Sequence, residues 1–211
     1  VDRDSAFRHD HIDLEKSTVR AIMEDRSQRL WIGTEGHGVF VIDGNEVTRI
    51  TQESGLLSND IIALVQNTNG DVYAGSARGL QKIEVRDQVK IVTILDGEYI
   101  NDLLFESSES IWFGTEKGIA NYNPRTGNVE WTYSIRGIDL IRISSMSLDD
   151  EGSLWLTSNR SGLLQIKESL VRNLTKPLLS GERINIVNQN FDNQLLIGSD
   201  QNSIDICTVR G

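Results

Sequence analysis

The sequence contains few of the residues that crosslink or rigidify a small fold. Its 211 residues include two prolines and a single cysteine, Cys207. One cysteine excludes an intramolecular disulfide and a cysteine-based metal site, and in its apolar surroundings we expect it to be a small buried side chain. No apolar run approaches the roughly 18 residues that a membrane-spanning helix needs. We therefore expect contact with a membrane only through segments outside this sequence.

Basic residues and histidines are also scarce. There are 21 Lys and Arg against 31 Asp and Glu, which gives a formal net charge of −10 and argues against a nucleic-acid partner. The histidines are His9, His11 and His37. His9 and His11 would share one face of a strand and could offer two zinc ligands, but no third ligand is identifiable, so we interpret them as exposed polar residues. No phosphate-binding, dinucleotide or nucleophile-elbow motif is present, and we predict no catalytic residue, no metal and no cofactor.

What the sequence does contain is a repeat. A short run of strand-forming residues, usually ending in Gly and a small polar residue, occurs five times, and its aromatic or Leu anchor recurs at positions 31, 73, 112, 155 and 196. A period of about forty residues over the whole chain is typical of a repeat fold. The five runs are Leu30–Thr34, Val72–Ser76, Ile111–Thr115, Leu154–Ser158 and Leu195–Ser199.

Each repeat combines short β-strands with polar turns, and the 18 glycines suit an array of hairpins. We predict an all-β fold, a β-propeller of about five four-stranded blades, in a single domain covering 1–211. A β-helix or two separate sandwiches are the alternatives. The predicted repeats cover approximately 18–51, 60–95, 99–134, 141–175 and 183–211.

The last repeat lacks room for a fourth strand, which raises the question of how the ring closes. Residues 4–11 align with the end of the outer strand of the first repeat and could supply the missing strand. The ring would then close with five blades. Alternatively, the chain is a segment of a larger propeller.

Two features of the repeat are interpreted as scaffold. A short polar or acidic residue stands six positions before each anchor, where it can cap a tight turn. The glycine after the anchor allows close packing against a neighbouring strand, although the fourth repeat has Thr157 there. We expect Trp31, Trp112 and Trp155 to pack between blades, and Trp131 to lie nearer the surface. The residues six positions before the anchors are Asp25, Asn67, Glu106, Asp149 and Asn190.

These runs resemble the two-component-regulator propeller repeat, found in extracytoplasmic sensor regions of bacterial hybrid histidine kinases. The resemblance rests on Leu30–Thr34 with Gly38-Val39, on Ile111–Thr115 with Gly118-Ile119, and on the linker 55–62. It implies a ligand-sensing or partner-binding domain on the periplasmic or extracellular face of a membrane receptor. A weaker similarity is to streptogramin-lyase-type propellers.

In a propeller, the loops after the anchor strands and the links into the next inner strand share one face around the channel mouth, where a concave site would form. The loops supply Glu35, His37, Arg78, Glu116, Lys117, Asn159, Arg160 and Asp200, and the links supply Asn59, Asp60, Tyr99, Asn101, Arg142 and Arg183. Variable polar loops on a repeated scaffold are where binding specificity lies. The residues predicted to bind a ligand are Glu35, His37, Asn59, Arg78, Asn101, Glu116, Lys117, Arg142, Arg160 and Asp200.

Three functions remain open from the sequence. The leading hypothesis is a non-catalytic sensor that binds a small polar ligand, such as a glycan fragment, or provides the dimer contact of a receptor. The second is a lyase-like or lactonase-like enzyme, in which Glu35 and His37 could act as base and acid. The third is a protein-interaction scaffold.

Overall fold

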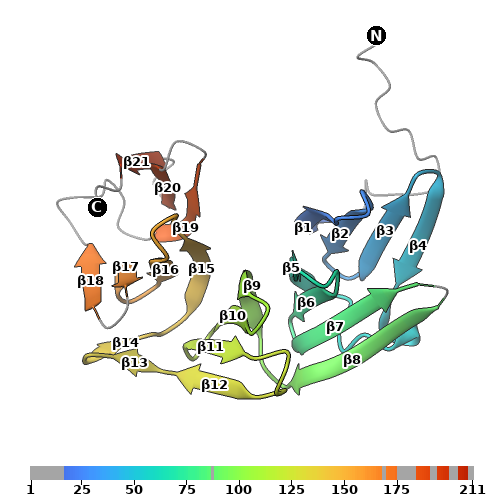
Figure 1. Ribbon diagram of the computed structural model, residues 1–211, viewed down its shortest axis with the longest axis horizontal. Helices are drawn as coiled ribbons and strands as arrows, with labels where there is room; N and C mark the ends of the chain where they lie inside the picture. The colour runs from blue at the N-terminus through green and yellow to red at the C-terminus, as the bar shows by residue number, and fades with distance from the viewer. Residues whose placement is uncertain are drawn as a thin grey trace, which may run out of the picture. The chain divides into compact units, whose positions relative to one another are not determined.

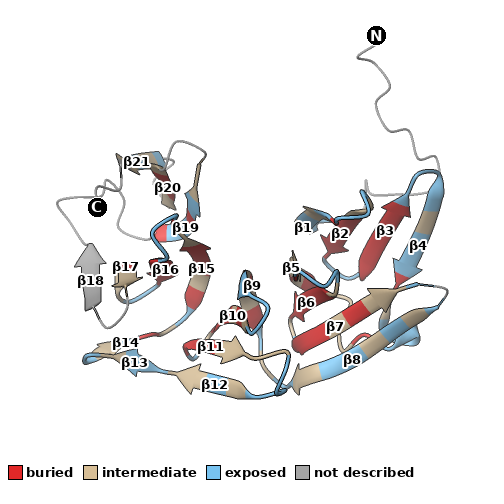
Figure 2. Cartoon of the chain, viewed as in Figure 1, coloured by how far each residue is buried: buried red, intermediate tan, exposed pale blue. Residues whose placement is uncertain are grey.

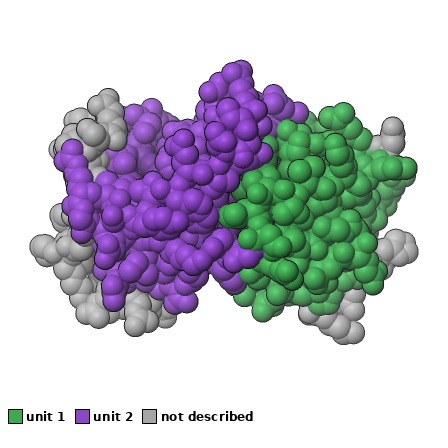
Figure 3. Space-filling model, turned by 90° about the horizontal axis from the view of Figure 1, so that it is seen from below, with its two compact units in different colours: residues 1–66, 70–96 green, residues 67–69, 97–211 purple. Residues whose placement is uncertain are grey.

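The computed structural model describes residues 17–86, 88–167, 170–174, 184–190, 194–199 and 204–208. The chain forms two compact units, coloured in Figure 3: residues 1–66 with 70–96, and residues 67–69 with 97–211. Both are built from antiparallel sheets in which the strands follow one another in chain order (Figure 1). The predicted all-β fold of repeated antiparallel sheets is therefore confirmed. The predicted closing strand at 4–11 lies outside the described residues.

Unit 1 contains two four-stranded sheets, which correspond to the first two repeats. A short 3₁₀ helix, η2 (Gln52–Ser54), follows the first sheet. The strands of the first sheet are β1 (Val19–Glu24), β2 (Leu30–Thr34), β3 (Val39–Asp43) and β4 (Glu46–Ile50). Those of the second are β5 (Ile61–Gln66), β6 (Val72–Ser76), β7 (Gly79–Val85) and β8 (Val89–Asp96).

Unit 2 contains the other three repeats. The third repeat forms β9 (Ile100–Ser107), β10 (Ser110–Thr115), β11 (Ile119–Tyr122) and β12 (Val129–Thr132). The fourth forms β15 (Ile143–Leu148), β16 (Leu154–Ser158), β17 (Gly162–Lys167) and β18 (Leu170–Leu174). The fifth forms a sheet of three described strands, β19 (Ile184–Gln189), β20 (Gln194–Ser199) and β21 (Ile204–Thr208).

One element was not predicted. After the outer strand of the third repeat, β13 (Ser134–Ile135) and β14 (Ile138–Asp139) form a separate two-stranded sheet. Its turn contains Arg136 and Gly137, both with positive φ, as expected for a two-residue hairpin. The sequence offers little signal for strands of two residues.

The anchor aromatic residues pack between successive sheets of a unit, as predicted. Trp31 is fully buried and clusters with Ile61 and Val72 of the second sheet. Trp155 likewise packs with Ile184 and Leu195 of the fifth repeat. Figure 2 shows the result in β2, β3 and β6, which are largely buried, whereas the outer strands β4 and β8 carry many exposed residues.

The glycine after the anchor has the predicted steric role. A Cβ on Gly33 would lie 2.8 Å from Cγ2 of Ile61, and one on Gly114 would lie 2.8 Å from Cγ2 of Ile143, closer than real Cβ contacts allow. The obstacle is mainly the isoleucine that begins the next inner strand, rather than backbone alone. In the fourth repeat Thr157 is fully buried at this position, and its hydroxyl lies 2.7 Å from that of Ser144.

The polar residue six positions before the anchor does more than cap a turn. Where the anchor is Trp, its indole N–H donates to a carboxylate: Trp31 to Asp25 at 2.8 Å, Trp112 to Glu106 at 2.9 Å and Trp155 to Asp149 at 2.8 Å. Where the anchor is Tyr73 or Leu196, which have no indole N–H, the residue is Asn67 or Asn190, whose side-chain oxygen accepts a turn N–H. The acid and the tryptophan therefore form one structural unit.

Candidate ligand-binding site

The first strand of each of the five repeats carries a β-bulge at the same position. The pairing with the anchor strand skips the second residue of β1, β5, β9, β15 and β19, so that this residue has no ladder partner. A bulge redirects a side chain and is common beside functional sites. The skipped residues are Arg20, Ile62, Asn101, Ser144 and Asn185.

In unit 2 the three bulge residues meet in a depression of about 670 Å³. Asn101, Ser144 and Asn185 come from three successive inner strands. Two other repeat positions complete the lining: the residue before the inner strand, and the first residue after the anchor strand. The first position supplies Tyr99 and Arg142, and the second supplies Glu116 and Asn159. Repetition of the blade thus brings one set of positions together several times around one hollow.

An ion pair stands at the rim of this depression. The Arg142 Nε donates to Oε2 of Glu116 at 2.7 Å, and the Asn101 amide donates to Oε1 of the same carboxylate at 3.3 Å. The Arg142 backbone N–H also donates to the Glu116 carbonyl oxygen at 3.0 Å. The two charged side chains are 56% and 41% exposed, so they remain available to a ligand.

Arg142 has an unusual backbone conformation. Its φ of 51° lies in the left-handed region, which costs free energy for a residue with a Cβ. Such strain tends to persist where the surrounding structure demands it, and here it occurs at the residue that closes the rim pair. The lining therefore offers a carboxylate, a guanidinium, amides, a hydroxyl and the Tyr99 ring, which together can bind a polar molecule through several directional hydrogen bonds.

Three of the residues predicted to bind a ligand are brought together here: Asn101, Glu116 and Arg142. Lys117 pairs with Glu98 at 2.5 Å, and neither it nor Arg160 lines the depression. Sequence reasoning missed Ser144 and Asn185 as binding residues. A signal was available, because both occupy the repeat position of Asn101, but the bulge that directs them has no sequence marker.

The predicted residues of unit 1 have local partners. Glu35 pairs with Arg20 at 2.9 Å, the repeat equivalent of the rim contacts in unit 2, and Arg78 pairs with Asp96 at 3.2 Å. The Asn59 side chain accepts the Gln52 N–H at 2.8 Å. Asp200 lies outside the described residues, as do His9, His11 and Arg183.

The hypothetical acid–base pair of Glu35 and His37 does not converge. The His37 Nδ1 lies 3.1 Å from the Glu35 carbonyl oxygen, while the Glu35 carboxylate is held by Arg20. Within the described part of the chain, no group of three or more His, Cys, Asp or Glu is placed to hold a metal ion. None of the helices described there has the length and apolar character needed to cross a bilayer.

Comparison with known proteins supports the repeat assignment. The family model for the two-component regulator propeller matches residues 13–36, which confirms the resemblance at the first repeat. No curated protein sequence matches the chain.

Solved structures define the fold class as a β-propeller. The chain is similar to the extracellular domain of the hybrid two-component system BT4673 from B. thetaiotaomicron, with a TM-score of 0.78, 20% identity, and coverage of 92% of this chain and 27% of that one. The extracellular domain of the hybrid two-component system BT3049 from the same organism gives a TM-score of 0.75 and 18% identity, with coverage of 95% of this chain and 29% of that one. Virginiamycin B lyase from Staphylococcus aureus gives a TM-score of 0.65 and 15% identity, with coverage of 92% of this chain and 70% of the lyase.

At these identities the likeness establishes the fold alone. The chain spans less than a third of the length of the two extracellular domains. The activity and partners of the whole protein therefore remain proposals.

Proposed function

We propose that this chain is part of the ligand-sensing propeller region of a bacterial two-component-type receptor, on the periplasmic or extracellular side of the membrane, and that it binds a small polar ligand without catalysing a reaction. The observation that carries the proposal is the depression lined by Asn101, Ser144 and Asn185 together with the Arg142–Glu116 pair. The resemblance to sensor propellers supplies the receptor context.

The chemistry of the depression favours a neutral or mildly charged molecule rich in hydroxyl groups, such as a glycan fragment. Amide and carboxylate groups can each exchange two hydrogen bonds with neighbouring hydroxyls, and Tyr99, which is 41% exposed, offers a ring face for stacking. Carboxylate and guanidinium neutralise each other at the rim, so the site does not select strongly for net charge.

The repeat supplies a matched control for a binding test. Glu116→Gln removes the carboxylate at the rim, and Glu35→Gln makes the same change at the equivalent position of the first sheet, outside the depression. We would screen thermal unfolding of the 211-residue chain with neutral mono- and disaccharides and with sugar acids. A compound present at a hundred times its Kd stabilises the folded state by about 2.7 kcal/mol, which raises the unfolding midpoint measurably.

The expected result is a compound that raises the midpoint of the wild type and of Glu35→Gln but has little effect on Glu116→Gln. Equal responses in both variants would place binding elsewhere. Chromatography would detect chemical conversion of the bound compound, and such conversion would contradict the proposal of a non-catalytic sensor and indicate an enzyme.

A further inference from the structure

An unexplained carboxylate lies directly behind this depression. Asp102 follows the bulge residue Asn101 on β9 and pairs with Gly114 of the anchor strand. The same repeat position is occupied by Ala21 in the first sheet and by Ala63 in the second. Alanine is therefore sufficient for the blade, and an ionisable group at this position needs another reason.

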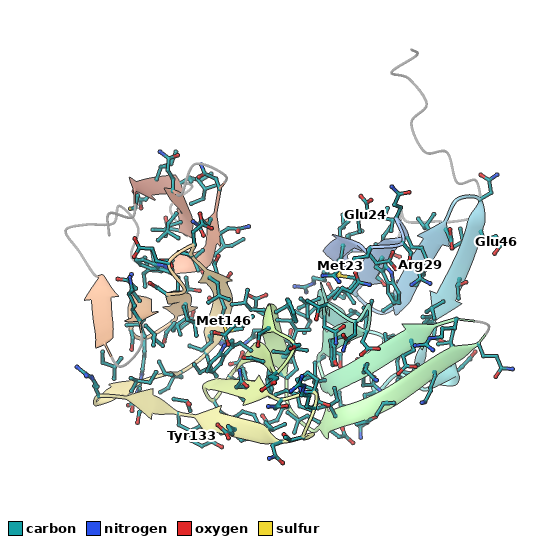
Figure 4. The ribbon with its side chains drawn as sticks, in the orientation of Figure 1. Met23, Glu24, Arg29, Glu46, Tyr133 and Met146 are labelled. Atoms are coloured by element: carbon teal, nitrogen blue, oxygen red, sulfur yellow. The ribbon has the colours of Figure 1, made fainter. Side chains whose placement is uncertain are left out.

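Asp102 connects two inner strands. Its Oδ2 accepts the backbone N–H of Met146 on β15 at 2.6 Å, and its Oδ1 accepts the Leu103 N–H at 2.9 Å. Figure 4 labels Met146 on β15. In the fourth sheet the equivalent residue, Ser145, makes the corresponding type of contact, because its hydroxyl donates to the Val187 carbonyl oxygen of β19 at 3.3 Å. This repeat position thus links each inner strand of unit 2 to the next.

The link adjoins the lining of the depression. Asp102 is the neighbour of Asn101, and Met146 is two residues from Ser144. Both lining residues are bulged, so no ladder pairing fixes their positions. The hydrogen bond from Met146 to Asp102 therefore joins β9 to β15 directly beside them both.

The surroundings leave this carboxyl group free of charged partners on the strands packed against it. Neither β10 nor β15 contains an ionisable residue, and on β9 the other one is Glu106, which accepts the indole N–H of Trp112. The charged groups at the depression end of these strands are Glu116 and Arg142, which pair with each other. Burial raises the pKa of Asp102 to about 6, against the opposing effect of its hydrogen bonds from the backbone N–H groups of Met146 and Leu103.

We propose that Asp102 is a positioning residue of the binding depression, and that gain or loss of its proton changes how β9 is held against β15 and hence the spacing of Asn101 and Ser144. The ionised carboxylate accepts both N–H groups through charge-assisted hydrogen bonds. When it takes a proton from solvent, one oxygen becomes a donor and the bond from Met146 weakens. The ionised form makes the stronger hydrogen bond between the two strands, and through it Asp102 sets the geometry of the depression. That a ligand binds in the depression rests on the proposed function.

The test needs no ligand. Backbone amide NMR spectra would be recorded from pH 4.5 to 7.5 for the wild type, Asp102→Asn and Asp102→Ala, with Asp139→Asn of the exposed β14 as control. We expect the amides of Asn101, Ser144 and Met146 to titrate with a shared midpoint near the pKa of about 6 in the wild type and the control. Both Asp102 variants should lose this midpoint. Asp102→Ala introduces the residue that the first two sheets have at this position. In the wild type, the chemical shift of the Asp102 carboxyl carbon reports the titration directly.

Absence of the shared midpoint in the wild type, or its persistence in Asp102→Asn, would overturn the inference. Because these spectra require no bound molecule, they remain informative if the saccharide screen finds nothing. If the screen finds a compound, its affinity should rise as pH increases through the midpoint in the wild type and stay level in Asp102→Asn.

Discussion

The carboxylate–indole pair of the first sheet allows a quantitative test of the scaffold. The buried carboxylate of Asp25 accepts the Trp31 indole N–H at 2.8 Å and the Arg29 Nε at 2.7 Å, while its other oxygen accepts the backbone N–H groups of Ser27 and Arg29. Arg29, labelled in Figure 4, also stacks over the Trp31 ring, 5.6 Å from its centroid. The perturbations are Asp25→Asn, Trp31→Phe and the two combined.

The double-mutant cycle isolates the indole hydrogen bond from the lost ring volume. A hydrogen bond to a charged group contributes about 1.5–3 kcal/mol, and leaving a buried donor without an acceptor costs about as much. We therefore expect a coupling free energy of about 1.5–3 kcal/mol between the two substitutions. Asp25→Asn alone should cost more than the coupling, because Arg29 loses its charged partner and keeps a hydrogen bond to the Val85 carbonyl oxygen at 3.0 Å.

The assay is urea unfolding of the four proteins at pH 7, followed by far-ultraviolet circular dichroism, because Trp31 itself is changed. The equivalent cycle on Asp149 and Trp155 in unit 2 should have the same sign. Coupling below about 0.5 kcal/mol in both cycles would refute the reading that acid and tryptophan act as a unit.

The lowered pKa of Asp25 predicts how the stability of the fold depends on pH. Desolvation would raise the pKa of Asp25, but its hydrogen bonds from Trp31 and Arg29 outweigh that effect and lower the pKa below the ordinary value of 3.8. A depressed pKa stabilises the fold at pH values above the ordinary one, and this contribution is lost as pH falls through the folded value. Asp25→Asn should flatten the acid limb of a stability profile below about pH 4.

The remaining predictions concern packing and the second buried carboxylate. Gly114→Ala should destabilise the chain by about 1–3 kcal/mol, because the new Cβ would press on Ile143; urea unfolding measures it, and a neutral result would contradict the steric argument. Thr157→Gly restores the residue of the other repeats yet should cost about 1 kcal/mol, since it loses the contact with Ser144 and adds chain flexibility. The pKa of Asp102 is raised from 3.8 to about 6, because the cost of burying its charge exceeds the gain from its stronger hydrogen bonds; its contribution to stability is therefore greatest at low pH and falls as pH rises through that window. Asp102→Asn should remove this fall, at most about 3 kcal/mol, in unfolding measured from pH 4 to 7.

Much of the fold could be predicted from the sequence because each repeat contains runs of strand-forming residues at a regular spacing. The five anchor runs correctly predicted five antiparallel sheets. Trp31 and Trp155 pack against the next sheet as expected. The hairpin of β13 and β14 escaped prediction, since strands of two residues carry no periodicity. Whether residues 4–11 close a ring stays a prediction.

The site was less predictable for a physical reason. Loops such as the one containing Glu116 can be located from the repeat, but the bulge that turns Asn101, Ser144 and Asn185 into one depression depends on hydrogen-bond register. Nothing in the sequence pattern distinguishes Asp102 from the other residues of the third repeat. Its interest appears only when the strand partner, the Met146 N–H, and the alanines at the equivalent position are known.

The most direct measurement of the central claim is a map of backbone amide shifts on adding a compound that raises the unfolding midpoint. The account predicts that the largest shifts fall on Asn101, Ser144, Asn159 and Asn185, and that they vanish in Glu116→Gln but remain in Glu35→Gln. Shifts concentrated on the loop of Glu35 and His37 instead, or equal losses in both variants, would contradict it.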